Sequence, residues 1–306
     1  MTFSPTKKPL VIYHSNCADG FGAAWCFHSY SPDGFEFHAG VYGKEPPDCT
    51  DRLVYLVDFS YKKEVVKKIC AVAKHVVLID HHASAIIDLA PLFSASSEEF
   101  ISNFAAITNL GKSGAMLAWD YLYNNAGESF EVHPWSLDYN HPPLLLNHIQ
   151  DRDLWKFKLP NTREISASLF SYEYTFEQWD ILMQGNQTDL LKMSVAGAAI
   201  ERKHHKDIAE LLKILTREMC IGDWVVPVAS LPYTLTSDAG HAMAKDYKEG
   251  TMFAACYWDT AEERIFSLRS TDNGMDVSKI AEQYGGGGHK NAAGFKVPRN
   301  HHLAQC

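Results

Sequence analysis

The sequence predicts an α/β protein in which a parallel-sheet domain is joined by a helical connector to a smaller α/β domain. Three short apolar runs predict strands at residues 10–13, 53–57 and 75–79. Helical patterns follow the first two runs, and this alternation is typical of βαβ units. Because open parallel sheets bind ligands beyond the carboxyl ends of their strands, the polar residues that follow these runs should converge on one crevice.

Each further element rests on a local pattern. The segment 20–30 combines alanines with aromatic residues, which is compatible with a helix. In 61–74, Val65, Ile69 and Val72 are spaced for one helical face, and Ser60 is placed to cap that helix. Helices are also predicted at 111–125, 142–157 and 193–219, and strands at 224–231, 252–258 and 264–270. We therefore place the first domain at 1–160, the connector at 161–222 and the second domain at 223–306.

Composition excludes several classes of protein. The 306 residues are 46% hydrophobic and 21% charged, which describes an ordinary globular chain. A formal charge of −9 argues against bulk electrostatic binding to long nucleic acids. The seven cysteines are scattered and contain no C-x-x-C pair, as in proteins that keep their thiols reduced inside the cell. With no signal peptide and no apolar stretch of the ~20 residues that span a bilayer, we expect a cytoplasmic protein without a membrane partner.

The residues that follow the predicted strands carry the chemistry. His14 follows the first strand, Asp58 the second, and Asp80, His81 and His82 the third. Further candidates are Cys17, Asp19 and one acid, either Asp151 or Asp153. Carboxylates and imidazoles without a cysteine cluster suit Mn²⁺, Mg²⁺ or Fe²⁺ better than structural zinc. Two such ions would need several carboxylates, one of which usually bridges them.

A glycine run at 285–288 suggests a second site. Glycines allow backbone N–H groups to approach an anion closely, and His289 and Lys290 add donors or charge. The run is therefore interpreted as a phosphate cradle; the alternative is a hinge.

Five segments together resemble the motifs of a known family. HSNCADGFGAAW, LVDFS, LIDHHAS, DRDLW and GGGGHKNAAGF follow, in this order, the motifs of the DHH phosphoesterase superfamily with a C-terminal DHHA1 domain. The resemblance runs from about residue 10 to about residue 297. Members include RecJ-like exonucleases, nano-RNases that also dephosphorylate 3'-phosphoadenosine 5'-phosphate, cyclic-dinucleotide phosphodiesterases and exopolyphosphatase-like proteins.

The resemblance implies a role for each matching residue. His14 would bind the first metal, Asp19 and His81 the second, and Asp58 would bridge them. Asp151 is preferred over Asp153 as the acid that completes the second site. His82 would face the substrate phosphate or protonate the leaving oxygen, while Asp80 orients a histidine. The residues implied in substrate binding are Arg269, Gly286, Gly287, Gly288, His289, Lys290 and Asn291.

One position departs from the family pattern. The first motif usually reads Asp-x-Asp, and here Cys17 occupies the first of these positions. A thiolate is a softer ligand for Mn²⁺ or Fe²⁺, so the first metal site would be weaker, changed in its metal preference, or empty. The alternative is that Cys17 is a small buried thiol without a role in metal binding.

The predicted function is that of a metal-dependent phosphoesterase. It would use one or two ions, Mn²⁺ first and Mg²⁺ or Fe²⁺ as alternatives, and cleave phosphodiester or phosphomonoester bonds of short oligonucleotides or small nucleotides. The alternatives are an exopolyphosphatase or pyrophosphatase acting on polyphosphate, and a degenerate protein that only binds nucleotides. A homodimer is the expected assembly.

Overall fold

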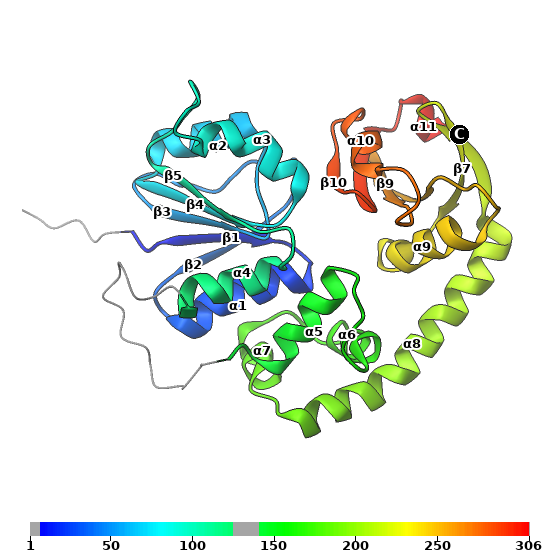
Figure 1. Ribbon diagram of the computed structural model, residues 1–306, viewed down its shortest axis with the longest axis horizontal. Coiled ribbons are helices and arrows are strands. Elements are labelled where there is room, and N and C mark those ends of the chain that lie inside the picture. The colour runs from blue at the N-terminus through cyan, green and yellow to red at the C-terminus, as the bar shows by residue number, and fades with distance from the viewer. Residues whose placement is uncertain (1–6, 125–140, 306) are drawn as a thin grey trace, which may run out of the picture. The chain divides into compact units, whose positions relative to one another are not determined.

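The computed structural model describes residues 7–124 and 141–305. The chain divides into two compact units, Met1–Glu201 and Arg202–Cys306, and each unit is described here by itself (Figure 1). The division falls inside helix α8 (Gln187–Leu215), within the segment predicted as the connector. Among the described residues, no helix is long and apolar enough to cross a bilayer.

The first unit is built on a five-stranded parallel sheet in the order β2-β1-β3-β4-β5. Its strands are β1 (Leu10–His14), β2 (Glu36–Gly40), β3 (Leu53–Val57), β4 (His75–Asp80) and β5 (Phe104–Thr108). The first strand lies between β2 and β3, so the order of the strands reverses beside β1. In open α/β sheets this switch point is where ligands bind, at the carboxyl ends of the strands.

Helices cover both faces of this sheet (Figure 1). Helices α2 (Lys63–Val72) and α3 (Ala83–Phe93) pack on one face, against inward residues such as Ile12 and Leu56. Helices α1 (Ala18–Tyr30) and α4 (Gly114–Trp119) pack on the other, against Val11 and Val57. Alternate residues of one strand thus pack into two cores, one on each face of the sheet. Because both faces are buried, the strand sequences are continuous apolar runs.

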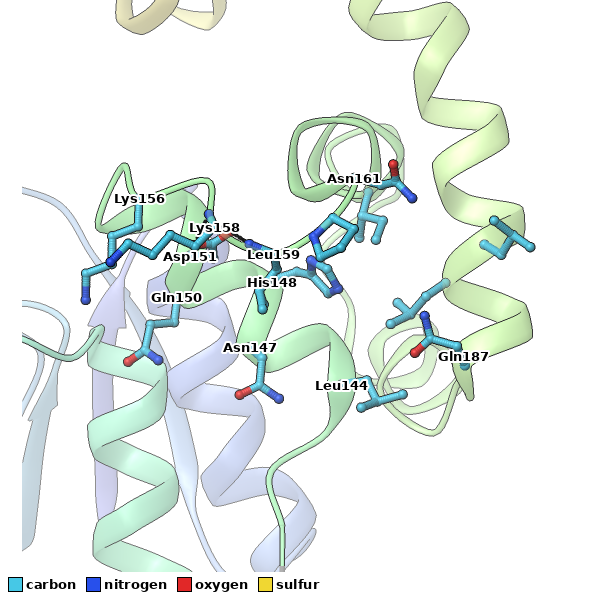
Figure 2. Close-up of a pocket in the computed structure, with 14 residues that line it drawn as sticks. Leu144, Asn147, His148, Gln150, Asp151, Lys156, Lys158, Leu159, Asn161 and Gln187 are labelled. Carbon is cyan, nitrogen blue, oxygen red and sulfur yellow. Dashed lines mark hydrogen bonds between the residues drawn. The ribbon is translucent and has the colours of Figure 1, made fainter.

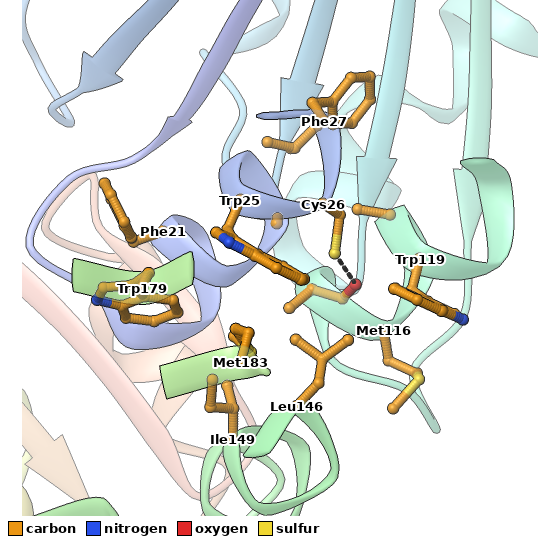
Figure 3. Close-up of a cluster of buried hydrophobic side chains, with 14 of the residues drawn as sticks. Phe21, Trp25, Cys26, Phe27, Met116, Trp119, Leu146, Ile149, Trp179 and Met183 are labelled. Carbon is orange, nitrogen blue, oxygen red and sulfur yellow. Dashed lines mark hydrogen bonds between the residues drawn. The ribbon is translucent and has the colours of Figure 1, made fainter. Parts of the chain in front are cut away.

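The second face carries the larger core, which further helices complete (Figure 3). They are the π-helical turn η1 (Asp120–Asn124), α5 (Leu144–Asp153), α6 (Thr162–Leu169) and α7 (Phe176–Met183). Trp25 and Trp179 are both fully buried here, and the Trp25 indole N–H donates to Asp180 Oδ1 at 2.8 Å. The Cys26 thiol lies 3.6 Å from the Ala115 carbonyl oxygen and ties α1 to α4.

The second unit contains a mixed six-stranded sheet in the order β10-β11-β9-β8-β7-β6. Its elements are β6 (Arg217–Ile221), β7 (Trp224–Ser230), η2 (Tyr233–Leu235), α9 (Thr236–Asp246), β8 (Ala254–Asp259), β9 (Glu263–Arg269), α10 (Val277–Glu282), β10 (Gly287–His289), β11 (Ala292–Pro298) and α11 (His302–Gln305). Only β7 and β8 pair in parallel. The predicted class, a parallel α/β unit and a second smaller α/β unit, is confirmed.

Three local predictions were wrong. Helix α2 begins at Lys63 with Lys62 at its N-cap, so Ser60 does not cap it. The helix predicted at 142–157 ends at Asp153, because Trp155 and Phe157 adopt left-handed backbone angles (φ 54° and 47°) that a helix cannot contain. The long helix stops at Leu215, and residues 217–219 belong to β6 instead.

Candidate metal centre

The turn between β1 and α1 presents three of the candidate side chains. His14 is the last residue of β1, Cys17 is the N-cap of α1, and Asp19 lies in the first turn of that helix. Gly20 packs directly on His14: a Cβ atom at Gly20 would lie 2.4 Å from the His14 carbonyl oxygen. Glycine at this position therefore allows the helix to approach the end of the strand closely.

Asp58 occupies a strained position at the end of β3. It follows the last strand residue, Val57, has φ of 50°, and is 1% exposed. A left-handed angle in a buried non-glycine residue costs of order 1–3 kcal/mol and is concentrated at functional sites. A Cβ atom on Gly114 would lie 2.4 Å from that of Asp58, so the start of α4 must be glycine for this carboxylate to fit.

The Asp-His-His triplet joins β4 to α3. Asp80 is the last residue of β4, and its Oδ1 accepts hydrogen bonds from the backbone N–H groups of His81 (2.7 Å) and His82 (3.2 Å). The same oxygen accepts from His82 Nδ1–H at 2.7 Å. Asp80 is fully buried, and its Oδ1 holds both histidines in place. Its Oδ2 is buried and has no hydrogen-bond partner among the described residues. The supporting role that the resemblance implies for Asp80 stays a prediction.

Asp58 lies between two groups of ligand atoms. Its Oδ1 is 3.1 Å from His81 Nε2, and its Oδ2 is 3.6 Å from His14 Nδ1. The first group consists of His14, Cys17 and Asp58, and the second of Asp19, His81 and Asp153; a further group joins Asp58 and His81 to Asp80 and His82. Within each group, the ligand atoms lie within 4.8 Å of one another. The His14 Nδ1 and Asp58 Oδ2 atoms are buried and have no hydrogen-bond partner among the described residues. A cation between them would satisfy both, so the donor set fits a divalent metal.

Asp19 is held by the helix that faces it. Its Oδ2 accepts the Gly114 N–H at 2.6 Å and its Oδ1 accepts the Ala115 N–H at 3.0 Å. Oδ2 is also 3.6 Å from His81 Nε2. Two N–H groups at the N-terminus of α4 therefore fix the carboxylate in place. Gly114 was not among the predicted site residues, although the small residues of Ser113-Gly114-Ala115 are the signal that would have identified it.

The electrostatics of the centre show an excess of negative charge. Burial, and then the charges of Asp58 and Asp153, raise the pKa of Asp19 well above its usual range. Burial would lower the pKa of His81, but Asp58, Asp153 and Asp19 outweigh it and raise the pKa to about 10. For Asp58 the imidazoles of His14 and His81 outweigh burial and hold the pKa below its usual range. A divalent cation would relieve the repulsion among these carboxylates.

The two acids on α5 have different surroundings, and the preference between them is reversed. Asp153 Oδ2 lies 3.5 Å from His81 Nε2. Asp151 instead accepts hydrogen bonds from the backbone N–H groups of Lys158 (2.9 Å) and Leu159 (3.0 Å) and from the Thr162 hydroxyl (2.7 Å). Because these three donors occupy the Asp151 carboxylate within the loop after α5, Asp153 is the acid available to the metal centre.

Cys17 belongs to the first group but is a poor ligand in the metal-free protein. Burial, followed by the charges of Asp58, Asp153 and Asp19, raises the pKa of its thiol well above its usual range. The thiol is therefore protonated at neutral pH, whereas a metal binds the thiolate. The first group thus offers one imidazole and one shared carboxylate, and the second offers one imidazole and several carboxylates.

In the second unit, the glycine run forms part of a hairpin. Gly287–His289 are strand β10, which pairs with β11. Gly288 has φ of 144°, and a Cβ atom at Gly286 would lie 2.1 Å from the Gly294 carbonyl oxygen. Close packing against β11 therefore accounts for these glycines, and the alternative prediction that the run is a hinge is wrong. The phosphate cradle stays a prediction.

The remaining predicted substrate residues have partners within the second unit. Lys290 Nζ donates to the Asp272 carbonyl oxygen (3.0 Å), and Asn291 Nδ2 donates to Asp272 Oδ1 (2.7 Å). The Arg269 guanidinium donates to the hydroxyls of Ser237 (2.8 Å) and Ser267 (3.0 Å). His289 lies half-buried in β10, one residue before the turn that carries Lys290 and Asn291. These contacts hold the side chains close together around one end of the hairpin.

Comparisons with known proteins give one family match and several remote relatives. Residues 236–305 match the family model of the DHHA1 domain. The uncharacterized protein R106 of Acanthamoeba polyphaga mimivirus is 28% identical over 325 residues, which cover 96% of this chain and 68% of that protein.

The similarity to solved structures is low in both sequence identity and TM-score. The pGpG-specific phosphodiesterase PggH of Vibrio cholerae has 15% identity and a TM-score of 0.46, with 95% of this chain and 94% of that chain covered. An exopolyphosphatase-related protein of Bacteroides fragilis has 13% identity and a TM-score of 0.44, with 98% and 89% covered. Similarity at this level says nothing about the substrate of this chain. The family match covers the glycine-rich motif, and it confirms the resemblance to DHH proteins in that part: the chain carries a C-terminal DHHA1 domain over residues 236–305.

Proposed function

We propose that this protein is a metal-dependent phosphoesterase that acts on short oligonucleotides or small nucleotides. The observation that carries the proposal is the position of Asp58, whose two oxygens face the imidazoles of His14 and His81. A carboxylate that bridges two groups of oxygen and nitrogen ligands is the arrangement of a two-metal hydrolase.

In this proposal the residues of the centre bind two ions, and Asp58 is shared between them. His14 and Asp58 hold one ion, with Cys17 as a weak third ligand, and Asp19, His81, Asp153 and Asp58 hold the other. A bound divalent cation, Mn²⁺ first with Mg²⁺ or Fe²⁺ as alternatives, supplies Lewis-acid activation of a phosphoryl oxygen. All other steps belong to side chains of the protein.

His82 is the proposed proton donor. Burial would lower its pKa, but Asp80 outweighs burial and raises the pKa in the metal-free protein to about 9. The contact of Nδ1 with Asp80 fixes the ring, and in this proposal Nε2 faces the substrate. An imidazolium held in this way stabilises charge on the phosphoryl group or protonates the leaving oxygen.

The residues at the end of the β10–β11 hairpin are the proposed substrate-binding residues of the second unit. They are Arg269, Gly286, Gly287, Gly288, His289, Lys290 and Asn291. We propose that they bind a phosphate or nucleotide end, since cationic and N–H donors gather there. The cytoplasmic location and the homodimer stay predictions, and light scattering on the purified protein tests the latter.

A substrate panel tests the proposal. Purified protein is assayed with Mn²⁺ against dinucleotides, 3'-phosphoadenosine 5'-phosphate, cyclic dinucleotides, pyrophosphate and polyphosphate. We expect hydrolysis of a nucleotide substrate that chelation removes and that Asp58→Asn abolishes, while Asp48→Asn, a matched change at an exposed acid, leaves it intact. Preference for polyphosphate would favour exopolyphosphatase activity instead.

One observation favours a second candidate. Cys17 lies in the first group of ligands with His14 and Asp58, where the resemblance implies an aspartate, and a thiol there weakens the site, as in a protein that has lost catalysis and only binds nucleotides. Saturable nucleotide binding without any metal-dependent hydrolysis across the panel would support that function and refute the enzyme.

A further inference from the structure

A pocket of about 450 Å³ lies in the first unit between α5, the loop that follows it and the start of α8 (Figure 2). We call it the α5–α8 pocket. Apolar walls come from Leu144, Ile165, Leu190 and Leu191. None of the residues assigned to the metal centre lines it. Its volume is within the range of ~300–1,000 Å³ that is typical of small-molecule sites.

The loop that forms one wall of the pocket is held in a strained conformation. Trp155, Phe157 and Asn161 all have left-handed backbone angles (φ 54°, 47° and 62°). The guanidinium of Arg152 lies 4.3 Å from the ring centre of Trp155, and that of Arg163 lies 3.7 Å from that of Phe157. Together with the hydrogen bonds of Asp151, these contacts keep the loop in one shape. The pocket is therefore formed in advance of any ligand.

His148 presents a hydrogen-bond acceptor to the pocket. The Thr162 hydroxyl has one proton, which it donates to Asp151 Oδ2 at 2.7 Å, so at 2.9 Å it accepts from His148 Nδ1–H. Neutral His148 consequently carries a lone pair on Nε2. The residue is 8% exposed and lines the pocket, and Nε2 makes no hydrogen bond to the described residues. Burial also lowers the pKa of His148, which favours this neutral form.

Other polar groups around the pocket define what a ligand must offer. The side-chain amides of Asn161 and Gln187 line it and make no hydrogen bonds within the described part of the chain. Lys156 and Lys158 also line it, and Figure 2 shows both extending on the side opposite Gln187. Lys158 Nζ has no acidic partner among the described residues. A ligand would therefore combine an apolar body, an N–H donor and an anionic group.

We propose that the α5–α8 pocket binds a nucleoside monophosphate. An amino or ring N–H group of the base donates to His148 Nε2, the base packs between the leucines, and the phosphate pairs with Lys158 and Lys156. This site is separate from the metal centre, and the inference does not depend on the proposed function.

Binding of adenosine 5'-monophosphate, measured by isothermal titration calorimetry on the full chain in EDTA, tests this inference. We expect saturable binding that Leu191→Trp removes by filling the pocket; Leu191 is 58% exposed, so the fold tolerates the change. The matched control is Val195→Trp, one helical turn further along α8 and 71% exposed, which should bind normally. Inorganic phosphate alone should bind far more weakly.

Two substitutions of His148 separate the hydrogen bond from the shape of the pocket. In His148→Asn the amide replaces Nδ1 and keeps the bond to Thr162 but lacks a group at Nε2, so affinity should fall roughly tenfold, as for one lost hydrogen bond. In His148→Gln the amide reaches the position of Nε2, so the loss should be smaller. Equal affinity in both variants and the wild type would refute the role of His148.

Three results would overturn the site as a whole. They are the absence of saturable binding, binding that Leu191→Trp leaves unchanged, and binding of phosphate as tight as that of the nucleotide. Binding that Asp58→Asn removes and Leu191→Trp does not would place the nucleotide at the metal centre. That outcome refutes this inference while supporting the proposed function, so the two can fail separately.

Discussion

Each unit contains a cluster of charged side chains that is at least partly buried, and the two clusters are built differently. In the second unit, Arg264 is 6% exposed and its guanidinium donates to both oxygens of Asp259, at 2.8 and 3.1 Å, and to the Leu303 carbonyl oxygen. The Asp259 carboxylate pairs with two guanidinium groups, those of Arg264 and Arg299, and the hydrogen bonds from Arg264 lower the pKa of Asp259 to about 2. This cluster stabilises the fold.

In the first unit the balance is different. Asp19, Asp58 and Asp153 all surround His81, and burial together with the neighbouring carboxylates raises the pKa values of Asp19 and Asp153. The surroundings thus disfavour the charges of Asp19 and Asp153 in the metal-free protein, and a bound cation would relieve this repulsion. The two clusters therefore differ in whether their carboxylates have enough cationic partners, more than in how deeply the side chains are buried. The following changes test this difference.

The largest effect is expected for Asp58→Asn. The substitution removes the carboxylate that both groups of ligands share. Hydrolysis should fall by more than about 100-fold, the upper limit that is usual for residues that only support a metal ligand. Steady-state kinetics at saturating Mn²⁺ measure the loss, and far-UV circular dichroism checks the fold. Activity within tenfold of the wild type would remove Asp58 from the centre.

The pair Asp153→Asn and Asp151→Asn should separate metal binding from stability. Because the pKa of Asp153 is raised in the folded protein, its charge is unfavourable there at neutral pH, and its removal should leave the metal-free protein equally or more stable. Affinity for Mn²⁺ should nevertheless fall roughly 10–100-fold. Asp151→Asn should keep this affinity and lose about 1–2 kcal/mol of unfolding free energy, because three hydrogen bonds are disturbed.

Calorimetry with Mn²⁺ and urea unfolding distinguish the two variants. If the affinity for Mn²⁺ is instead lost in Asp151→Asn and kept in Asp153→Asn, Asp151 is the metal ligand, as the resemblance to the family implied.

A smaller effect is expected for Cys17→Asp. A carboxylate replaces a protonated thiol beside His14 and Asp58, so the first group gains a hard oxygen ligand. Affinity for a second Mn²⁺ should rise by about tenfold or less, detected as a change in stoichiometry by calorimetry. Cys17→Ser, which adds no charge, is the control. No gain over this control would place Cys17 outside the metal ligands.

The smallest effect is expected for Asp259→Asn in the balanced cluster. Because the pKa of Asp259 is lowered in the folded protein, its ionised form stabilises the fold above the ordinary pKa near 4, and this contribution is lost as the pH falls towards 2. Asp259 is partly exposed, so the expected loss at pH 7 is about 1 kcal/mol or less. Urea unfolding at pH 7 and at pH 2.5 should show a difference from the wild type that is clearly smaller at pH 2.5, because the contribution disappears fully only below the folded pKa of about 2.

Much of the centre followed from local sequence patterns. His14, Asp58 and Asp80 were identified because apolar runs predict strands, and the ends of parallel strands meet at one edge of the sheet. The short strands β2 and β5 were missed because Glu36–Gly40 is partly exposed and Phe104–Thr108 is only weakly apolar. Helices α6 and α7 fell in the segment that was treated as the connector.

The sequence by itself determined the parallel α/β class of the first unit, the residues at the strand ends and the DHHA1 resemblance, since these depend on periodicity and on motifs that are contiguous along the chain. Only the tertiary structure decided between Asp151 and Asp153, because residues two apart on a helix point about 200° apart and the sequence does not say which side faces the sheet. It also decided that the glycine run is strand β10 and that His148 Nε2 lines a pocket, because both depend on contacts between segments distant in sequence.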